Sequence, residues 1–326
     1  MKCISRSTRF ASLVLCFCMG GAIAQSYPVK PVRFLSIFAA GSSGDLFIRI
    51  FSNGFAENLG QPVLIENIAG AGGVVAAERV AHAAPDGYTL LSSISGTHVQ
   101  RLFLAKSTPF HPVNDFTPIT SVVDSVTYMV ASSTFPVNSL KELIEYARAN
   151  PGKVSYGSSG VGSPSHLATE LLKVNAGIDL VHVPYKSIAQ ALQDAIGGQI
   201  PITYAISNQV IPPWKAGKIK ILAITNAQRY APMGDIPTIG EVVPGYEAAP
   251  GWTGVLGPAN LPAPILKRIH ADMVKAINTP EAVRKYNEAG AVVMTSPTPE
   301  DFAARIRHEV EVTGRIVKRA GIQAVD

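Results

Sequence analysis

Two stretches rich in glycine and serine concentrate the groups of this sequence that could bind a small ion. The first, FAAGSSGD, covers residues 38–45, and the second, YGSSGVGSPSHL, covers residues 156–167. Each follows a short apolar run and leads into a helical pattern, so each would present the unpaired backbone N–H groups of a first helical turn. Such donors attract anions, and glycine lets a ligand approach the backbone. The predicted chemistry is capture of a small anion.

The second stretch carries residue types that suit the start of a helix beside an anion. Ser163 suits the N-cap and Pro164 the first helical position, while Ser158 and Ser159 add hydroxyl groups. A helix end contributes about 0.3–1 kcal/mol to anion binding, and a hydrogen bond to a charged group about 1.5–3 kcal/mol. Because micromolar binding needs about 8 kcal/mol, one loop is too weak, and we expect both to grip a carboxylate across a cleft.

Other chemistries that use glycine and serine find less support. Gly160 and Gly162 begin a dinucleotide-binding GxGxxG pattern, but Ser165 stands where the third glycine belongs. The phosphate-binding GxxxxGKS/T and serine-hydrolase GxSxG patterns are absent. The seven histidines show no metal-ligand spacing. We therefore expect no cofactor, no metal and no catalysis, with an unconventional serine hydrolase as a minor alternative.

Short apolar runs that alternate with helical patterns must position these stretches. A helix is expected after the first stretch, because apolar residues recur there at helical spacing. They are Leu46, Phe47, Ile50, Phe51 and Phe55. Alternating strands and helices build parallel sheets, so we expect an α/β fold. The expected strands cover residues 32–38, 62–66, 88–94, 153–157, 180–183, 200–205 and 219–225.

The length of the chain favours two lobes, because 326 residues exceed one ordinary hydrophobic core. Proline and glycine gather between residues 232 and 264. These residues interrupt regular structure, so we expect the chain to pass between the lobes there.

The first 24 residues have the pattern of a secretory signal. Lys2, Arg6 and Arg9 form a positive start, an apolar run covers residues 10–19, and small residues end the segment at Ala24. We expect export to the periplasm and cleavage after about Ala24. The apolar run is too short for a transmembrane helix, which needs about 20 residues.

All three cysteines, Cys3, Cys16 and Cys18, lie inside this segment, so the processed chain would have no disulfide or thiolate chemistry. The bulky residues Leu15 and Phe17 that precede two of them argue against a lipid-anchored cysteine. Removal of the segment also lowers the formal net charge from +5 to about +2. That charge is no signature of nucleic-acid binding.

Ten short motifs follow one another along the chain in the order of a known family. They are YPVKPVRFLSIFAAGSSGD, LGQPVLIENIAGAGG, AAPDGYTLL, GTHV, DFTPIT, GKVSYGSSGVGSPSHLA, VHVPYK, AGKIKILAIT, DIPTIGEV and GYE. On these motifs the chain resembles the periplasmic solute-binding proteins of tripartite tricarboxylate transporters, also called the Bug receptors. The resemblance covers essentially the whole chain.

The resemblance implies a two-lobed Venus-flytrap fold of the type II periplasmic-binding-protein class, with the ligand held between the lobes. In such a fold the chain crosses between the lobes twice. From the strand order we expect residues 25–126 and 247–326 to form lobe 1 and residues 127–246 to form lobe 2. The two crossings would act as a hinge.

The resemblance also assigns candidate ligand-binding residues in both stretches. They are Phe38, Ala39, Ala40, Gly41 and Ser42 in the first and Ser158, Ser159 and Ser163 in the second. Three further motif positions are matched by Asp45, His166 and Tyr185, and we expect their role to be mainly structural. Tyr185 is nevertheless included among the candidate ligand-binding residues.

Several positions depart from the family pattern. Ile37 stands where a proline is usual, Ser42 and Ser187 where glycines are usual, and Pro201 where an acidic residue is common. Arg101 replaces a common asparagine. A guanidinium near the cleft could pair a second carboxylate in a bidentate manner, so Arg101 is a further candidate ligand-binding residue. The alternative for Arg101 is a solvated position on a helix surface.

These observations together predict a non-enzymatic periplasmic receptor that closes around a small organic carboxylate. By resemblance it would act as a monomer and deliver the ligand to membrane transporter subunits. A subunit that presents its ligand to a membrane histidine kinase is the alternative, with an orphan periplasmic hydrolase third. The sequence leaves the ligand open among dicarboxylates, aromatic carboxylates, amino acids and nicotinate-like acids.

Overall fold

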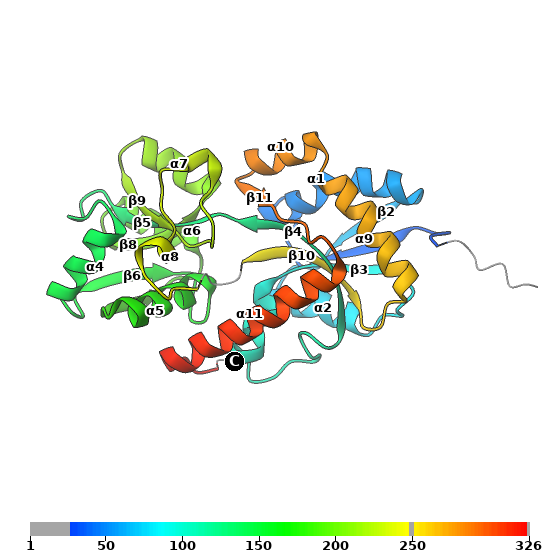
Figure 1. Ribbon diagram of the computed structural model, residues 1–326, viewed down its shortest axis with the longest axis horizontal. Coiled ribbons are helices and arrows are strands. Elements are labelled where there is room, and N and C mark those ends of the chain that lie inside the picture. The colour runs from blue at the N-terminus through cyan, green and yellow to red at the C-terminus, as the bar shows by residue number, and fades with distance from the viewer. Residues whose placement is uncertain (1–26, 248–250, 325–326) are drawn as a thin grey trace, which may run out of the picture.

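Two α/β lobes lie side by side in the computed structural model, which describes residues 27–247 and 251–324 (Figure 1). The expected signal segment and its three cysteines lie outside the described residues. Each lobe has its own sheet with helices on its faces. The α/β class expected from the alternating pattern is confirmed.

Lobe 1 is built on a six-stranded sheet in the order β11-β4-β10-β3-β1-β2. β1 pairs in parallel with β2 and β3, whereas β10 runs antiparallel to β3 and β4. The strands are β1 (Val32–Ser36), β2 (Val63–Asn67), β3 (Thr89–Ile94), β4 (Phe116–Ser125), β10 (Trp252–Pro258) and β11 (Ala291–Val293).

Lobe 2 is built on a five-stranded sheet in the order β7-β6-β8-β5-β9. β6 pairs in parallel with β7 and β8, and β5 runs antiparallel to β8 and β9. The strands are β5 (Thr127–Ser132), β6 (Val154–Ser158), β7 (Leu180–Pro184), β8 (Ile202–Ile206) and β9 (Ile219–Ile224).

Helices cover the faces of both sheets and connect the strands. In lobe 1 they are α1 (Ser43–Leu59), η1 (Ala71–Gly73), α2 (Val74–Ala81), η2 (Gly96–Gln100), α3 (Arg101–Leu104), α9 (Ala263–Ile277) and α10 (Pro280–Glu288). In lobe 2 they are α4 (Leu140–Ala149), α5 (Pro164–Ala176), α6 (Ile188–Ile196), α7 (Ser207–Lys215), η3 (Ala231–Met233) and α8 (Ile239–Val242), and the last helix is α11 (Pro299–Ala320).

The seven strands expected from the sequence all form, and each boundary lies within two residues of the expected one. The expectation of parallel sheets is only partly right, because both sheets are mixed. β4, β5, β10 and β11 were not expected. β4 leads toward lobe 2 and β10 returns from it, so these two neighbours must run in opposite directions.

The apolar face of α1 differs from the expected one at Leu46 and Ile48, and the expected Ile50 is only half-buried. Phe47, Phe51 and Phe55 are buried as expected, but Ile48 is buried as well. Leu46, which was expected on this face, is 47% exposed. The core of lobe 1 covers the three phenylalanines and Ile48, and Leu46 points away from it.

The final helix, α11, packs against both lobes. Phe302 and Ile306, in its first half, join the buried cluster that includes Trp252 of lobe 1. Val312 and Ile316, in its second half, join the buried cluster on the sheet of lobe 2. Figure 1 shows this helix lying along the junction of the lobes. The lobe limits expected from the sequence stay a prediction, and α11 is a feature that those limits did not anticipate.

Candidate functional site

The first loop, residues 38–42, connects β1 to α1 in lobe 1. Ser42 is the N-cap of α1, and its hydroxyl accepts the N–H of Asp45 at 3.4 Å. The N–H of Gly41 donates to Asp45 Oδ2 at 2.9 Å. Gly41 has a φ of +78°, a conformation that favours glycine. The loop is thus closed by a side chain of the helix that follows it.

The buried carboxylate of Asp45 accepts hydrogen bonds from the first loop, from α1 and from β2. Arg49 Nε donates to its Oδ2 at 2.8 Å, and Asn67 Nδ2 donates to its Oδ1 at 2.7 Å. Asn67 Nδ2 also reaches the Phe38 carbonyl at 3.0 Å. Burial by itself raises the pKa of Asp45, but hydrogen bonds from Arg49, the Gly41 N–H and Asn67 leave that pKa below its usual value. The carboxylate therefore stays ionised at neutral pH.

The second loop, residues 158–163, connects β6 to α5 in lobe 2. Ser163 is the N-cap of α5 and Pro164 opens the helix, so both sequence assignments are confirmed. The hydroxyl of Ser163 accepts the N–H of His166 at 3.3 Å. The N–H of Gly162 donates to His166 Nδ1 at 2.9 Å. Gly160 and Gly162 both have positive φ.

Ser158 lies inside the second loop, with its side chain buried. Its hydroxyl accepts the Gly160 N–H at 3.1 Å and lies 3.1 Å from the Gly160 carbonyl and 2.6 Å from His182 Nε2. The structure thus gives the Ser158 hydroxyl a part in shaping the loop. Ser159 is exposed, and its N–H donates to Ser165 Oγ at 3.2 Å.

Tyr185 is half-buried and is hydrogen-bonded to the second loop. Its N–H donates to the Ser158 carbonyl at 3.0 Å and its hydroxyl donates to Asp194 at 2.9 Å. A Cβ at Gly157 would lie 3.1 Å from its ring, which explains the glycine there. These contacts support the mainly structural role expected for Tyr185.

In the two loops, the exposed residues Ala39, Ala40 and Val161 have backbone N–H groups that make no hydrogen bond to the described part of the chain. Gly41 and Gly162 give their N–H groups to Asp45 and His166, so the N–H groups of Ala39, Ala40 and Val161 are the ones at the loop surface that a ligand could use. Val161 was missed by the sequence reasoning, which looked for glycine and hydroxyl residues.

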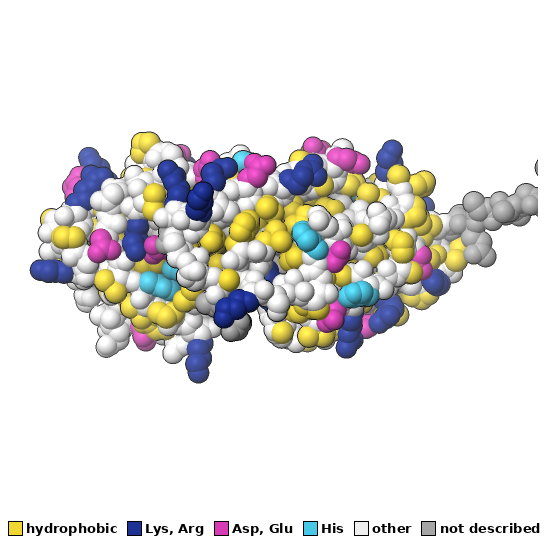
Figure 2. Space-filling view, turned by 90° about the horizontal axis from the view of Figure 1, so that it is seen from below, with side chains coloured by type: hydrophobic (Ala, Val, Ile, Leu, Met, Phe, Trp, Pro, Cys, Tyr) yellow, Lys and Arg dark blue, Asp and Glu magenta, His cyan; other side chains and the backbone are white. Residues whose placement is uncertain are grey.

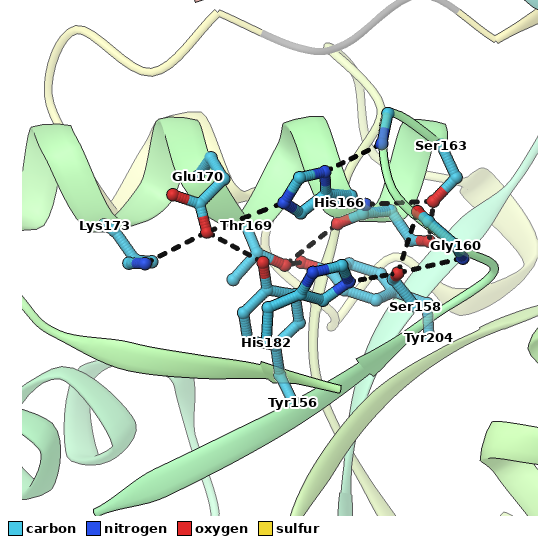
Figure 3. Close-up of polar contacts among 12 residues, drawn as sticks. Tyr156, Ser158, Gly160, Ser163, His166, Thr169, Glu170, Lys173, His182 and Tyr204 are labelled. Carbon is cyan, nitrogen blue, oxygen red and sulfur yellow. Dashed lines mark hydrogen bonds and ion pairs between the residues drawn. The ribbon is translucent and has the colours of Figure 1, made fainter. Parts of the chain in front are cut away.

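The rings of His166 and His182 stack behind the second loop, with centroids 4.0 Å apart and planes 13° apart (Figure 3). The ring of Tyr156 stacks on the other face of His182 at 5.0 Å. Glu170 accepts from the Tyr156 hydroxyl at 2.8 Å and from Lys173 at 3.0 Å. Burial lowers the pKa of both histidines, that of His182 to about 4, so both rings are neutral at pH 7.

Arg101 lies on α3, between the glycine turn of η1 and the second loop. A Cβ at Gly72 would lie 3.9 Å from Arg101 Nη1. Its Nε is buried and has no hydrogen-bond partner among the described residues. Leu104, one turn later, covers Gly162, where a Cβ would lie 2.5 Å from Leu104 Cδ1. Helix α3 of lobe 1 therefore touches the second loop of lobe 2 and places Arg101 at the junction of the lobes.

A cavity of about 640 Å³ also opens at this junction, between α11 and lobe 2. None of the ten candidate residues lines it. It borders the second loop at Ser165, whose hydroxyl bonds to Ser163 and to the Ser159 N–H. Its other walls include Asp124, Thr127, Asn226, Gly251 and Arg305.

A half-buried ionic network beside this cavity ties α11 to the strands that cross between the lobes. Arg305 donates to both oxygens of Asp124 on β4, at 3.0 and 2.9 Å, and to Glu309 at 2.9 Å. Trp252 Nε1 on β10 donates to Glu309 Oε2 at 2.6 Å. Burial raises the pKa of Glu309 to about 7, although these hydrogen bonds oppose the shift. No local sequence signal could have paired residues so far apart.

The described residues contain neither a metal-binding cluster nor a membrane-spanning helix, and the face drawn in Figure 2 carries charges of both signs. In residues 27–247 and 251–324, no group of three or more His, Cys, Asp and Glu side chains could hold a metal ion. Within the same ranges, no helix is long and apolar enough to cross a membrane. On the face drawn in Figure 2, lysine and arginine side chains are scattered over both lobes among acidic ones, and hydrophobic side chains gather near the middle.

Comparison with known sequences identifies relatives along nearly the whole chain. The model of the tripartite tricarboxylate transporter family receptor matches residues 47–322. The chain is 32% identical to a UPF0065 protein of Bordetella pertussis over 323 residues, which are 99% of each chain. It is 30% identical to BugT of the same organism over 300 residues, which are 91% of each.

Solved structures resemble this one over similar lengths. A protein of R. palustris solved with adipate is 31% identical with a TM-score of 0.77, over 92% of this chain and 100% of that one. MatC of Rhodopseudomonas palustris with bound malate is 31% identical with a TM-score of 0.71, over 89% and 100%. The periplasmic binding protein BugD is 31% identical with a TM-score of 0.72, over 92% and 100%. The expected two-lobed fold is confirmed.

Proposed function

The chain belongs to the tripartite tricarboxylate transporter receptor family, and from that premise we propose that it captures a small organic carboxylate between its lobes for uptake by such a transporter. The observation that carries the proposal is the pair of glycine-serine loops, one on each lobe, which leave exposed N–H donors at Ala39, Ala40 and Val161. The relatives solved with adipate and malate support the choice of a carboxylate.

In this proposal the first loop holds one carboxylate through backbone donors. The N–H groups of Ala39 and Ala40 would face the ligand beside the Ser42 hydroxyl, and Phe38 would form a wall, since its ring packs against Gly44. Gly41 would allow the turn without binding the ligand through its own N–H, because that N–H donates to Asp45. Ordered waters can replace direct contacts where the loop stands back from the ligand.

The second loop would hold the same ligand from lobe 2. Val161 would supply an N–H, and Ser159 and Ser163 would supply hydroxyls at the start of α5. Ser158 and Tyr185 would support the loop from behind. Arg101 would face a second anionic group, because its buried Nε lacks a partner in the described residues and a buried N–H without an acceptor is costly.

Closure of the lobes would follow ligand binding. The proposed hinge consists of the two crossings, the first between β4 and β5 and the second before β10, with the lobe limits at residues 126/127 and 246/247. Because α11 packs on both lobes, closure would slide lobe 2 along the second half of this helix. The proposal further includes export to the periplasm with cleavage after about Ala24, a monomeric receptor and no catalysis.

A thermal-shift screen of carboxylates tests the proposed function. A ligand at 100 times its dissociation constant stabilises a folded protein by about 2.7 kcal/mol. We expect malate, adipate or a related acid to raise the melting temperature, and the matching alcohol or amide, which lacks the charge, to leave it unchanged. If the uncharged analogue raises it equally, or if dicarboxylates, aromatic acids, amino acids and nicotinate all fail, the proposal is wrong.

A further inference from the structure

The contact between Gly162 and His166 defines the protonation state of that histidine. Because the Gly162 N–H donates to His166 Nδ1 at 2.9 Å, that nitrogen must be without a proton. The proton of the neutral ring then lies on Nε2, which is 4.0 Å from Glu170 Oε1. A second proton could enter only at Nδ1, where it would face the N–H of Gly162. Protonation therefore removes the acceptor that holds Gly162.

His182 supports the other end of the same loop. Its Nε2 lies 2.6 Å from Ser158 Oγ, and this hydroxyl also accepts the Gly160 N–H. Because the two rings stack 4.0 Å apart, an imidazolium at one position disfavours an imidazolium at the other. The pair thus fixes both ends of the second loop while both rings are neutral (Figure 3).

Among the charged groups around the pair, Glu170 favours an imidazolium and Lys173 opposes it, but burial outweighs both. Glu170 is the nearby anion, but it is already shared by Lys173 and the Tyr156 hydroxyl. Lys173 lies on the same helix and opposes a further positive charge. From β8, the Tyr204 hydroxyl approaches only as far as Thr169, at 2.7 Å. Burial therefore keeps the pKa of both histidines below its usual value, although Glu170 opposes this shift, and the neighbouring His166 lowers the pKa of His182 further.

We propose that His166 and His182 are positioning residues of the carboxylate site, and that protonation of His166 in acidic solution releases Gly162 and lowers the affinity for the ligand. This inference rests on the proposed function. Val161, which offers an N–H to the ligand, immediately precedes Gly162, so a change at Gly162 moves this donor. An imidazolium would attract the carboxylate, but the ring lies behind the loop and gains its proton only by losing the contact that shapes the loop.

The test compares the pH dependence of adipate and malate binding in the wild type and in His166→Asn, measured by calorimetry from pH 8 to pH 5. The asparagine Oδ1 can occupy the place of Nδ1 and accept the Gly162 N–H, but it does not titrate. Ionisation of the ligand affects both proteins equally, so the ratio of their affinities cancels it. Above pH 7 we expect the ratio of the wild-type affinity to the His166→Asn affinity to stay constant. At pH values below the pKa of His166, this ratio should fall by at most about tenfold per pH unit.

Three further variants separate positioning from folding. His182→Gln places an amide near the position of Nε2 and should retain wild-type affinity at pH 7, whereas His166→Ala, which has no acceptor, should bind at least several-fold more weakly. His82→Asn makes the same change at an exposed histidine that follows α2 in lobe 1, and should leave the pH profile as in the wild type. A parallel pH profile in the wild type and His166→Asn, or a higher wild-type affinity at acidic pH, would overturn the inference.

A readout without ligand distinguishes failure of this inference from failure of the proposed function. In the free protein, nitrogen NMR should show His166 Nδ1 as an unprotonated acceptor, and the Gly162 amide should lose protection from exchange as His166 titrates. If His166 titrates while the Gly162 amide stays protected, the positioning role is wrong. If protection is lost but no carboxylate binds, the positioning role stands and the proposed function falls.

Discussion

The two glycine-serine loops have the same construction but different chemistry at one position. In both, a serine N-cap follows a glycine, and the residue four positions after that glycine accepts its N–H. In the first loop this acceptor is Asp45, and in the second it is His166. An ionised carboxylate with its own arginine is a permanent acceptor, whereas a neutral imidazole is an acceptor that a proton removes. The two loops thus share a local design, but of the two acceptors only His166 would lose its acceptor role by gaining a proton in acidic solution.

The surroundings of the two acceptors explain the choice of residue. Asp45 receives hydrogen bonds from Arg49 and Asn67, so its charge is compensated where it is buried. His166 lies beside Glu170 and under the ring of His182, where a second carboxylate would repel the first. At the position of His166 in lobe 2, a neutral hydrogen-bond acceptor is therefore favoured over a carboxylate.

The largest difference between the loops should appear when each acceptor is deleted. Asp45→Ala leaves the Gly41 N–H, Asn67 and Arg49 without their shared partner, so we expect a loss of about 2–4 kcal/mol in the free energy of unfolding. His166→Ala removes one neutral acceptor and a stacking partner, with an expected loss of about 1–2 kcal/mol. Urea denaturation of both variants measures this, and equal losses would show that the charge of Asp45 has no special weight.

Blocking the turns tests whether both loops bind the ligand. Gly41→Val and Gly160→Val force a branched residue into φ values of +78° and +114°, at a strain of about 1–3 kcal/mol. Each should lower the affinity for the carboxylate about tenfold or more, as calorimetry on folded protein would show. The matched control is Gly177→Val, which has a φ of +62° at the far end of α5. If either loop variant bound the carboxylate as tightly as the wild type, that loop would not contribute to binding, and the two-loop proposal would be wrong.

Arg101 tests whether lobe 1 contributes more than its loop. A charge-assisted hydrogen bond is worth about 1.5–3 kcal/mol. Arg101→Ala should therefore lower the affinity for a dicarboxylate about tenfold to a hundredfold, and should change the affinity for a matched monocarboxylate little. Titration of adipate against hexanoate makes this comparison. Equal losses for both acids, or no loss for either, would return Arg101 to a role in packing against η1.

The smallest expected effect concerns the acid stability of lobe 2. The pKa of His182 is about 4 in the folded protein and about 6.5 when unfolded. Its contribution is therefore complete above pH 6.5 and is lost as the pH falls toward 4. Because the ring is partly exposed, we expect about 1 kcal/mol. His182→Gln should flatten the fall in unfolding free energy between pH 7 and pH 5 by this amount.

His98 of lobe 1 provides the reference for this measurement. Its ring is fully buried against Pro112 and Ser93, and burial lowers its pKa to about 4. An acid-dependent loss of stability should therefore persist in His182→Gln. If that variant has the same pH profile as the wild type, His182 takes no part in the acid response.

Local signals in the sequence predicted the parts of this protein that depend on neighbouring residues. The N-cap Ser163, the proline that opens α5 and the seven expected strands all follow from spacing and residue type within a few positions. The motif order identified the family for the same reason, because each motif is continuous in the chain. The exposed position of Leu46 shows the limit of such local signals. Helical spacing predicts which side of α1 is apolar, but not which residues at the margin of that side are buried.

The tertiary structure alone decided which distant residues meet. His182 reaches His166 because β7 pairs with β6, the strand that leads into the second loop. Arg305 reaches Asp124 because α11 lies along the strands that cross between the lobes. A side chain's pKa and its hydrogen-bond partner depend on burial and on groups brought close by folding, and neither is encoded in local spacing. The sequence therefore determined the two loops, and the fold determined that one is held by a charge and the other by a neutral ring.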